Sequence, residues 1–159
     1  MNKLTTKVNL SDWLGVKFAN SENGIAFDNH FDHKFAIVQD FVESRDDDFK
    51  TPVIYYQVFP EETASQFLAT LKQELASKLG MPKTNSRQSI LEVIKAAELK
   101  LIILDEIHLQ PLDTLQNLLG FLASCNISVI LLGYRSKMEI AQILALPSVS
   151  TWDQLEIST

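Results

Sequence analysis

The residues with the clearest chemical potential are two adjacent acids, Asp105 and Glu106, which follow the aliphatic run Leu101-Ile-Ile-Leu104. A continuous aliphatic run is typical of a strand buried in a parallel sheet. The carboxyl end of such a strand is where open α/β sheets bind ligands. There the first acid could help to hold a magnesium ion, and the second could polarise an attacking water. If the site is active, we therefore expect Asp105 to lie on the metal side and Glu106 to be the catalytic glutamate.

A site for magnesium and a triphosphate also needs a phosphate loop with the pattern Gly-x-x-x-x-Gly-Lys-Ser/Thr. None of the five glycines in the sequence is followed by lysine. The loop is expected after the first strand, where backbone N–H groups at a helix N-terminus face the anion. When the pattern is laid on residues 19–26, Gly24 matches the second glycine, Ile25 stands at the lysine and Ala26 at the hydroxyl.

In this interpretation Asn23, Gly24, Ile25 and Ala26 form a degenerate phosphate loop, and Glu22 adds a repelling charge. Losing one charge-assisted hydrogen bond costs about 1.5–3 kcal/mol. We therefore expect no tightly bound ATP, and leave weak binding of ATP with magnesium open. The alternative for this segment is an ordinary strand–turn–helix connection that never bound phosphate.

A second aliphatic run, residues 127–132, ends in Gly133, Tyr134 and Arg135. At the end of a strand beside the acid pair, Tyr134 could donate a hydrogen bond to a γ-phosphate. Arg135 could contact the same phosphate, or form a plain salt bridge with one of the two acids. We include both as candidate cofactor-binding residues.

The bulk composition restricts the classes of protein to consider. A length of 159 residues indicates one domain over residues 1–159. The net charge of −6 argues against direct DNA binding by the lone chain, because phosphate neutralisation needs clustered Lys and Arg. A single cysteine excludes an internal disulfide. With no signal peptide and no apolar run of membrane-spanning length, we expect a cytoplasmic protein without membrane attachment.

Strand-like and helix-like segments alternate along the chain. Five strands are expected, over residues 13–18, 53–59, 101–105, 127–132 and 152–157. Helices are expected over residues 25–44, 60–79, 86–97, 112–122 and 136–146. Five strands with helical crossovers predict an α/β fold in three layers (αβα) around a five-stranded, mainly parallel sheet.

Three segments of the chain resemble AAA+ ATPases of the TniB/TnsC type, which regulate DNA transposition. These segments are Pro52-Val-Ile-Tyr-Tyr-Gln-Val, Leu101-Ile-Ile-Leu-Asp-Glu-Ile-His and Ile127-Ser-Val-Ile-Leu-Leu-Gly. They occur in the family's order, and the resemblance covers about half of the chain. It implies a RecA-like P-loop NTPase core with strand order 5-1-4-3-2. By motif match, Asp105 would be the magnesium-side acid of the Walker B strand and Glu106 the catalytic glutamate.

The sequence departs from this family's pattern in four ways. Ile25 and Ala26 stand at the Walker A lysine and hydroxyl, and Tyr134 stands where the sensor is normally Thr or Asn. No arginine lies between Leu146 and Trp152, where the family supplies a finger to its neighbour. The sequence also stops after the fifth expected strand, without the helical lid. We therefore expect a protein that is inactive as an ATPase when alone.

Three functions remain open at this point. The first is a non-hydrolysing interaction module whose partners are an AAA+ homologue or transposition proteins, namely a transposase or a target selector. The second is a weak ATP-binding or ATP-hydrolysing AAA+ subunit that a partner completes. The third is a folded transposon remnant without a function.

Overall fold

One five-stranded parallel sheet organises the protein. The computed structural model describes residues 9–28, 34–46, 50–80, 89–107, 111–134 and 140–157. The strands are β1 (Gly24–Asp28), β2 (Val53–Gln57), β3 (Leu101–Asp105), β4 (Ser128–Tyr134) and β5 (Asp153–Ile157). Their order is β2-β3-β4-β1-β5, and each neighbouring pair is parallel. Counted from the other edge this is 5-1-4-3-2, so the expected strand order is confirmed.

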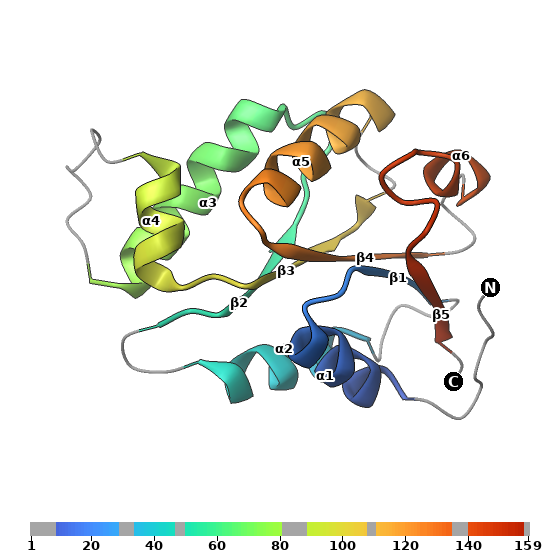
Figure 1. The fold of residues 1–159 in the computed structure, drawn as a ribbon, viewed down its shortest axis with the longest axis horizontal. Coiled ribbons are helices and arrows are strands. Elements are labelled where there is room, and N and C mark those ends of the chain that lie inside the picture. The colour runs from blue at the N-terminus through green and yellow to red at the C-terminus, as the bar shows by residue number, and fades with distance from the viewer. Residues whose placement is uncertain are drawn as a thin grey trace.

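Helices cover both faces of the sheet and give the expected three layers (Figure 1). One face is covered by the two N-terminal helices, and the other by the helices that follow β2 and β3. The helices are α1 (Leu10–Asn20), α2 (Lys34–Arg45), α3 (Ala64–Lys78), α4 (Ile90–Ala97), α5 (Leu112–Ser124) and α6 (Ile140–Leu144). None of the helices in the described part of the chain has the length and apolar character needed to cross a membrane.

The alternation of side chains along β3 decides which face the acid pair adjoins. All five residues of β3 are buried. Ile102 and Leu104 belong to the larger apolar cluster, which also contains residues of α3, α4 and α5. Leu101 and Ile103 belong to the second cluster, with residues of α1 and α2. Because successive side chains point to opposite faces, Asp105 lies on the side of the sheet that α1 and α2 cover.

The expected first strand over residues 13–18 is wrong, because these residues lie inside helix α1. The buried residues of α1 are Leu10, Trp13, Leu14 and Lys17, which follow the i, i+3, i+4, i+7 spacing of a helix. The side chain of Asn9 caps the helix by accepting a hydrogen bond from the backbone N of Asp12 at 2.8 Å. The aliphatic stem of Lys17 completes the buried stripe, which a pattern of apolar residues alone does not reveal.

The expected helix from residue 25 is wrong at its start, because residues 24–28 form β1. β1 is the strand between β4 and β5, with Gly24 opposite Ile130 on one side and Asp153 on the other. A short apolar run is compatible with either a helix or a strand, and its neighbours in the sheet decide between them. The remaining strands and the helices α3, α4 and α5 lie within a few residues of their expected positions.

Candidate functional site

The carboxyl ends of the strands bring several candidate residues to one edge of the sheet. Asp28 at the end of β1 lies opposite Tyr134 at the end of β4. Gln57 at the end of β2 lies opposite Asp105 at the end of β3. Ligands of open α/β sheets bind outside this edge. The structure therefore places Asp105 and the backbone of Tyr134 at the same edge.

Both carboxylate oxygens of Asp105 accept hydrogen bonds from the protein. The hydroxyl of Tyr55, on the neighbouring strand β2, donates to Oδ2. The backbone N–H of Glu106 donates to Oδ1 at 2.8 Å. Asp105 is only 4% exposed, and a buried carboxylate needs such partners because an unpaired one is costly. The two bonds hold the carboxylate towards its own strand and β2.

The first turn of α2 packs an aromatic ring against the residue that binds Asp105. The rings of Phe35 and Tyr55 meet edge to face, with centroids 5.6 Å apart and planes at 75°. Aromatic pairs favour this arrangement. Phe35 remains 50% exposed, so the pair lies at the surface beside the acid. Sequence analysis missed Tyr55 as a site residue, because the link between positions 55 and 105 exists only once β2 and β3 pair.

Glu106 occupies an unusual backbone and side-chain position. Its φ angle is +60°, in the left-handed region that non-glycine residues adopt infrequently. Its Oε2 atom is buried and has no hydrogen-bond partner among the described residues. An unsatisfied buried acceptor of this kind costs about 1–3 kcal/mol. Glu106 is therefore the residue of the pair with a carboxylate oxygen that no described residue uses as an acceptor.

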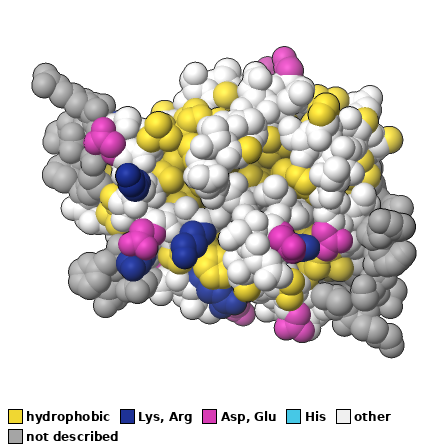
Figure 2. Space-filling model, viewed as in Figure 1, with side chains coloured by type: hydrophobic (Ala, Val, Ile, Leu, Met, Phe, Trp, Pro, Cys, Tyr) yellow, Lys and Arg dark blue, Asp and Glu magenta, His cyan; other side chains and the backbone are white. Residues whose placement is uncertain are grey.

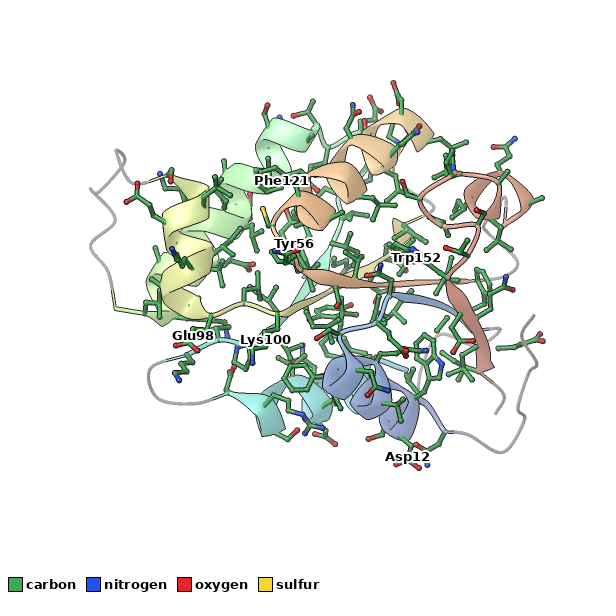
Figure 3. All side chains as sticks on the ribbon, viewed as in Figure 1. Asp12, Tyr56, Glu98, Lys100, Phe121 and Trp152 are labelled. Atoms are coloured by element: carbon green, nitrogen blue, oxygen red, sulfur yellow. The ribbon has the colours of Figure 1, made fainter. Side chains whose placement is uncertain are left out.

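A second buried acid lies after β2, which the sequence analysis also missed. Glu62 is 6% exposed, and its Oε2 accepts a hydrogen bond from the Tyr56 hydroxyl. Its Oε1 accepts from the backbone N of Phe59 at 3.2 Å. Burial and then the hydrogen bond to Glu62 raise the pKa of Tyr56 well above its usual value. Figure 3 shows Tyr56 between the sheet and the helices above it. The bonds of Glu62 to Tyr56 and Phe59 order the loop before α3.

The expected phosphate loop over residues 19–26 is wrong in its position. Gly24, Ile25 and Ala26 are the first three residues of β1, and Ile25 and Ala26 are fully buried in the two apolar clusters. The turn before β1 lies at the amino end of the strand, whereas Asp105 lies at a carboxyl end. A nucleotide at the acid pair would not meet these residues, because the length of the sheet separates them.

Asn23 and Gly24 have structural roles at this amino edge. The Asn23 Oδ1 accepts a hydrogen bond from the backbone N of Val129 at 2.8 Å, which ties the start of β1 to β4. A Cβ atom on Gly24 would lie 2.6 Å from Cη2 and 2.7 Å from Cζ2 of Trp13. Gly24 is therefore needed so that the indole of α1 can lie directly on β1.

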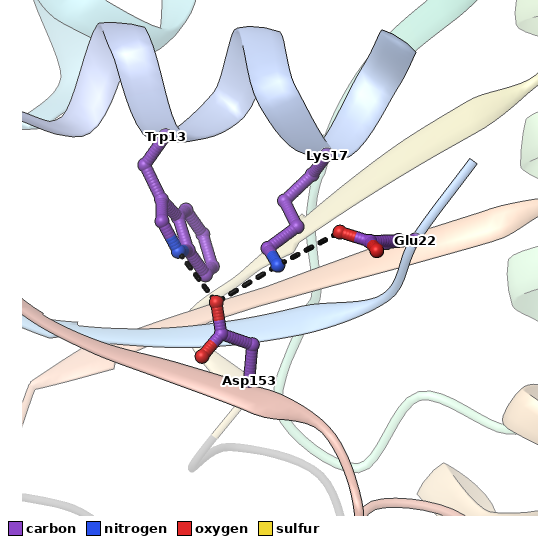
Figure 4. Close-up of polar contacts among 4 residues, drawn as sticks. All are labelled: Trp13, Lys17, Glu22 and Asp153. Atoms are coloured by element: carbon purple, nitrogen blue, oxygen red, sulfur yellow. Dashed lines mark hydrogen bonds and ion pairs between the residues drawn. The ribbon is translucent and has the colours of Figure 1, made fainter. Parts of the chain in front are cut away.

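A buried lysine joins the same edge to β5 (Figure 4). Lys17, whose side chain is 8% exposed, contacts Oδ2 of Asp153 at 2.8 Å and Oε1 of Glu22 at 3.1 Å. The indole Nε1 of Trp13 donates to the same Oδ2 at 3.2 Å. Glu22, which sequence analysis placed inside a phosphate loop, is thus a partner of Lys17.

The contacts in this cluster shift the pKa values of Lys17 and Asp153 in opposite directions. Burial by itself lowers the pKa of Lys17, but the hydrogen bonds to Asp153 and Glu22 outweigh it, and the pKa is raised. Burial by itself raises the pKa of Asp153, but the hydrogen bonds from Lys17 and Trp13 outweigh it, and the pKa is lowered. Both groups therefore hold their charges more firmly than isolated side chains would.

With β1 at residues 24–28, the connection to the next helix runs from Asp28 to α2. The phosphate-loop pattern laid on residues 28–35 has Asp28 and His33 at the two glycines, Lys34 at the lysine and Phe35 at the hydroxyl. Lys34 is the first residue of α2, which is where a phosphate-binding lysine is expected. Residues 29–33 and Arg135 lie outside the described residues, and of Tyr134 only the backbone is described.

The fold and the position of the acid pair define a protein with a P-loop NTPase-like core. A family model described as "AAA domain" matches residues 16–140. The chain belongs to this family, and its α/β sheet is the RecA-like core of an AAA+ protein. A search of curated proteins found no match.

The family raises the question of whether these residues fit a magnesium ion. P-loop NTPases hold magnesium with a Ser/Thr hydroxyl of the loop and the Walker B acid. Here Phe35 has no oxygen to offer, and both oxygens of Asp105 accept hydrogen bonds from Tyr55 and Glu106. No group of three or more His, Cys, Asp or Glu among the residues the structure describes could hold a metal ion. The described side chains therefore do not fit magnesium in the manner of the family.

Proposed function

We propose that this AAA-domain protein is a degenerate relative of the TniB/TnsC type. In this proposal it acts as a non-hydrolysing interaction module in DNA transposition. The observation that carries the proposal is the aromatic pair beside the Walker B acid. Tyr55 donates its hydroxyl to Asp105, and Phe35 packs against Tyr55 from the first turn of α2.

This arrangement disfavours a bound magnesium nucleotide for a physical reason. Magnesium requires a near-octahedral set of oxygen ligands and gives up its water reluctantly. A metal at Oδ2 of Asp105 would compete with the Tyr55 hydroxyl for that oxygen and would find a phenyl ring at position 35. The lost hydrogen bond to a charged group costs about 1.5–3 kcal/mol, and the missing hydroxyl ligand adds to that cost.

The proposed partners follow from the resemblance to TniB/TnsC-type proteins. They are an intact AAA+ homologue, a transposase or a target selector. Direct binding of DNA by this chain is not part of the proposal, since the net charge is −6. In this role the AAA core is a rigid scaffold that presents surfaces to the other proteins of the assembly.

Calorimetric titration of the purified chain with ATP and magnesium tests the loss of nucleotide binding. We expect no saturable heat at nucleotide concentrations up to about 1 mM, which corresponds to a binding free energy weaker than about −4 kcal/mol. A Phe35→Thr, Tyr55→Phe double variant places a hydroxyl at position 35 and removes the Tyr55 hydrogen bond to Asp105. This variant should bind ATP with magnesium more tightly than the wild type. Micromolar, magnesium-dependent binding by the wild type would refute the proposal.

The interaction role needs its own experiment. The chain is mixed with a purified intact TniB/TnsC-type ATPase or with its transposase, and complexes are measured by size-exclusion chromatography with light scattering. Co-elution with either protein is the expected result. If neither forms a complex, the chain fits the third hypothesis, a folded remnant without partners.

A second candidate is a weak ATP-binding subunit that a partner completes, and two observations favour it. Lys34 begins the helix after β1, and Glu106 keeps a buried oxygen without a partner among the described residues. In this case the neighbouring subunit supplies what the site lacks. ATP turnover of a mixture with an intact relative should then fall for Lys34→Ala and for Glu106→Gln. Equal turnover of the wild type and both variants removes this candidate.

A further inference from the structure

The edge of the sheet opposite the acid pair carries a cavity that none of the functions above uses. It has a volume of about 450 Å³ and lies between α4 and the segments that lead into β3 and β4. Leu99 and Lys100 precede β3, and Cys125 precedes β4, so the cavity lies at the amino edge. We call it the α4 groove.

The α4 groove has an apolar floor and an exposed apolar wall. Ile94 and Leu99 form its floor and are each 6% exposed, and Cys125 is partly exposed beside them. Leu91 is 54% exposed, on a helix whose buried residues are Val93, Ile94 and Ala97. In Figure 2 apolar side chains appear on this face beside α4, next to basic ones. Exposed apolar surface of this kind with a charged rim is typical of interaction sites.

The rim of the groove is positively charged in an otherwise acidic protein. Lys95 and Lys100 line it and are exposed, and neither forms an ion pair with another described residue. The one acid of the rim, Glu98, pairs with Lys50 at 3.3 Å, so its charge is offset. Figure 3 shows Glu98 and Lys100 at neighbouring ends of α4 and β3. Two lysines without an ion-pair partner in the described part of the chain, against a net charge of −6, give this groove a local preference for acidic partners.

We propose that the α4 groove binds an acidic amphipathic helix of a partner protein. An apolar side chain of that helix inserts between Leu91 and Cys125, while its carboxylates contact Lys95 and Lys100. The cavity volume of about 450 Å³ leaves room for apolar side chains of such a helix. A nucleic acid fits less well, because its backbone needs many cations and has no use for an apolar floor. This inference rests on the proposed interaction role and names the chemistry of one partner.

Fluorescence anisotropy with two synthetic peptides tests the proposal. The first is a labelled helical peptide with leucines at i, i+4 and i+7 and glutamates on its other faces, and its twin has lysine at each glutamate. We expect saturable binding of the acidic peptide and binding of the twin at least about tenfold weaker. A Lys95→Glu, Lys100→Glu double variant should reverse that preference, and Leu91→Ser should weaken the acidic peptide on the order of tenfold.

Two control variants change residues that do not line the groove. Lys78→Glu on α3 changes the same kind of charge, and Phe59→Ser removes another exposed apolar side chain, which is 59% exposed. Neither should alter peptide binding by more than about twofold. Circular dichroism of every variant excludes loss of the fold as the reason for weakened binding.

The single cysteine of the chain provides a second, independent measurement. Cys125 lines the groove, so a saturating acidic peptide should slow its alkylation by iodoacetamide on the order of tenfold. The proposal would be overturned by equal binding of the two peptides, by no effect of the lysine double variant, or by unchanged alkylation. Self-association through the groove would overturn it as well. None of these measurements involves ATP or transposition proteins, so the α4 groove can fail while the proposed function stands.

Discussion

At the scale of single residues, the hydrogen bond from Tyr55 to Asp105 is the main contact of a buried acid at the carboxyl edge of the sheet. Asp105 is buried at the end of a strand without an exposed residue. The Tyr55 hydroxyl and the Glu106 backbone N–H both donate to it. A buried carboxylate that loses a donor keeps its desolvation cost without compensation. The bond from Tyr55 therefore stabilises the fold.

Tyr55→Phe should lower the free energy of unfolding by about 1–2 kcal/mol, because the variant removes one donor to a buried charge and keeps the ring. Urea unfolding followed by tryptophan fluorescence measures this change. Ser124→Ala is the control, since it removes an exposed hydroxyl whose bond to the Phe121 carbonyl oxygen (2.6 Å) is solvated. If both variants unfold at the urea midpoint of the wild type, the Tyr55 bond does not stabilise the protein.

At the scale of elements, the packing of α1 on β1 and β5 fixes the amino edge of the sheet. Trp13 lies directly on Gly24, and Lys17 reaches Asp153 at the start of β5. β5 is an edge strand whose pairing in the sheet is with β1. The contacts from α1 therefore hold both strands in place, and changes at this junction should act on stability and leave the acid pair intact.

Gly24→Ala should destabilise the protein by about 1–3 kcal/mol, because the new methyl group would overlap the Trp13 ring at 2.6 Å. Gly120→Ala is the matched control. Gly120 lies inside α5, and apart from its own helix backbone and chain neighbours nothing lies within 4 Å of the new Cβ. This change should stabilise by about 0.5–1 kcal/mol through helix propensity. Urea unfolding of both variants measures the difference, and the same shift for both would contradict the packing role of Gly24.

Asp153→Asn tests the charge cluster through its dependence on pH. The pKa of Asp153 is lowered in the folded state, so its charge stabilises the fold above the ordinary aspartate pKa and loses this effect as the pH falls. Because Asp153 is 41% exposed, we expect a loss of only about 1 kcal/mol at neutral pH. The difference from the wild type should shrink below about pH 4. A difference that stays constant into acid would show that the carboxylate charge is not involved.

At the scale of the whole molecule, acids lie at both edges of the sheet. Asp105 and Glu106 lie at the carboxyl edge, and Glu22 and Asp153 flank Lys17 at the amino edge. The chain as a whole carries a net charge of −6. Long-range repulsion therefore opposes any close approach of a polyanion such as duplex DNA.

The isolated chain should not bind duplex DNA at physiological salt. Electrostatic neutralisation of phosphates supplies most of non-specific binding, and the chain offers a net negative charge. Anisotropy of a labelled duplex should give a Kd weaker than about 100 µM at about 150 mM salt. A micromolar Kd that weakens steeply with added salt would contradict this expectation.

The local sequence pattern was sufficient to predict most helices and strands, but not α1 and β1. The aliphatic runs before Asp105 and Tyr134 predicted β3 and β4, because a strand buried on both faces admits few polar residues. α1 was missed because Lys17 takes a buried position, and charged residues are rarely counted as core. β1 was missed because its five residues are too short for a periodicity, and its pairing with β4 and β5 is a property of the sheet.

By itself, the sequence determined the class of fold, the parallel sheet and the presence of two acids at a strand end, because burial and periodicity are encoded locally. Only the tertiary structure decided which residues surround those acids. Tyr55 and Asp105 are fifty positions apart, and they meet because β2 and β3 lie side by side in register. The structure also showed that residues 24–26, expected in a phosphate loop, begin strand β1. The place of a loop depends on which segment becomes the strand before it, and that choice is made by packing in the assembled sheet.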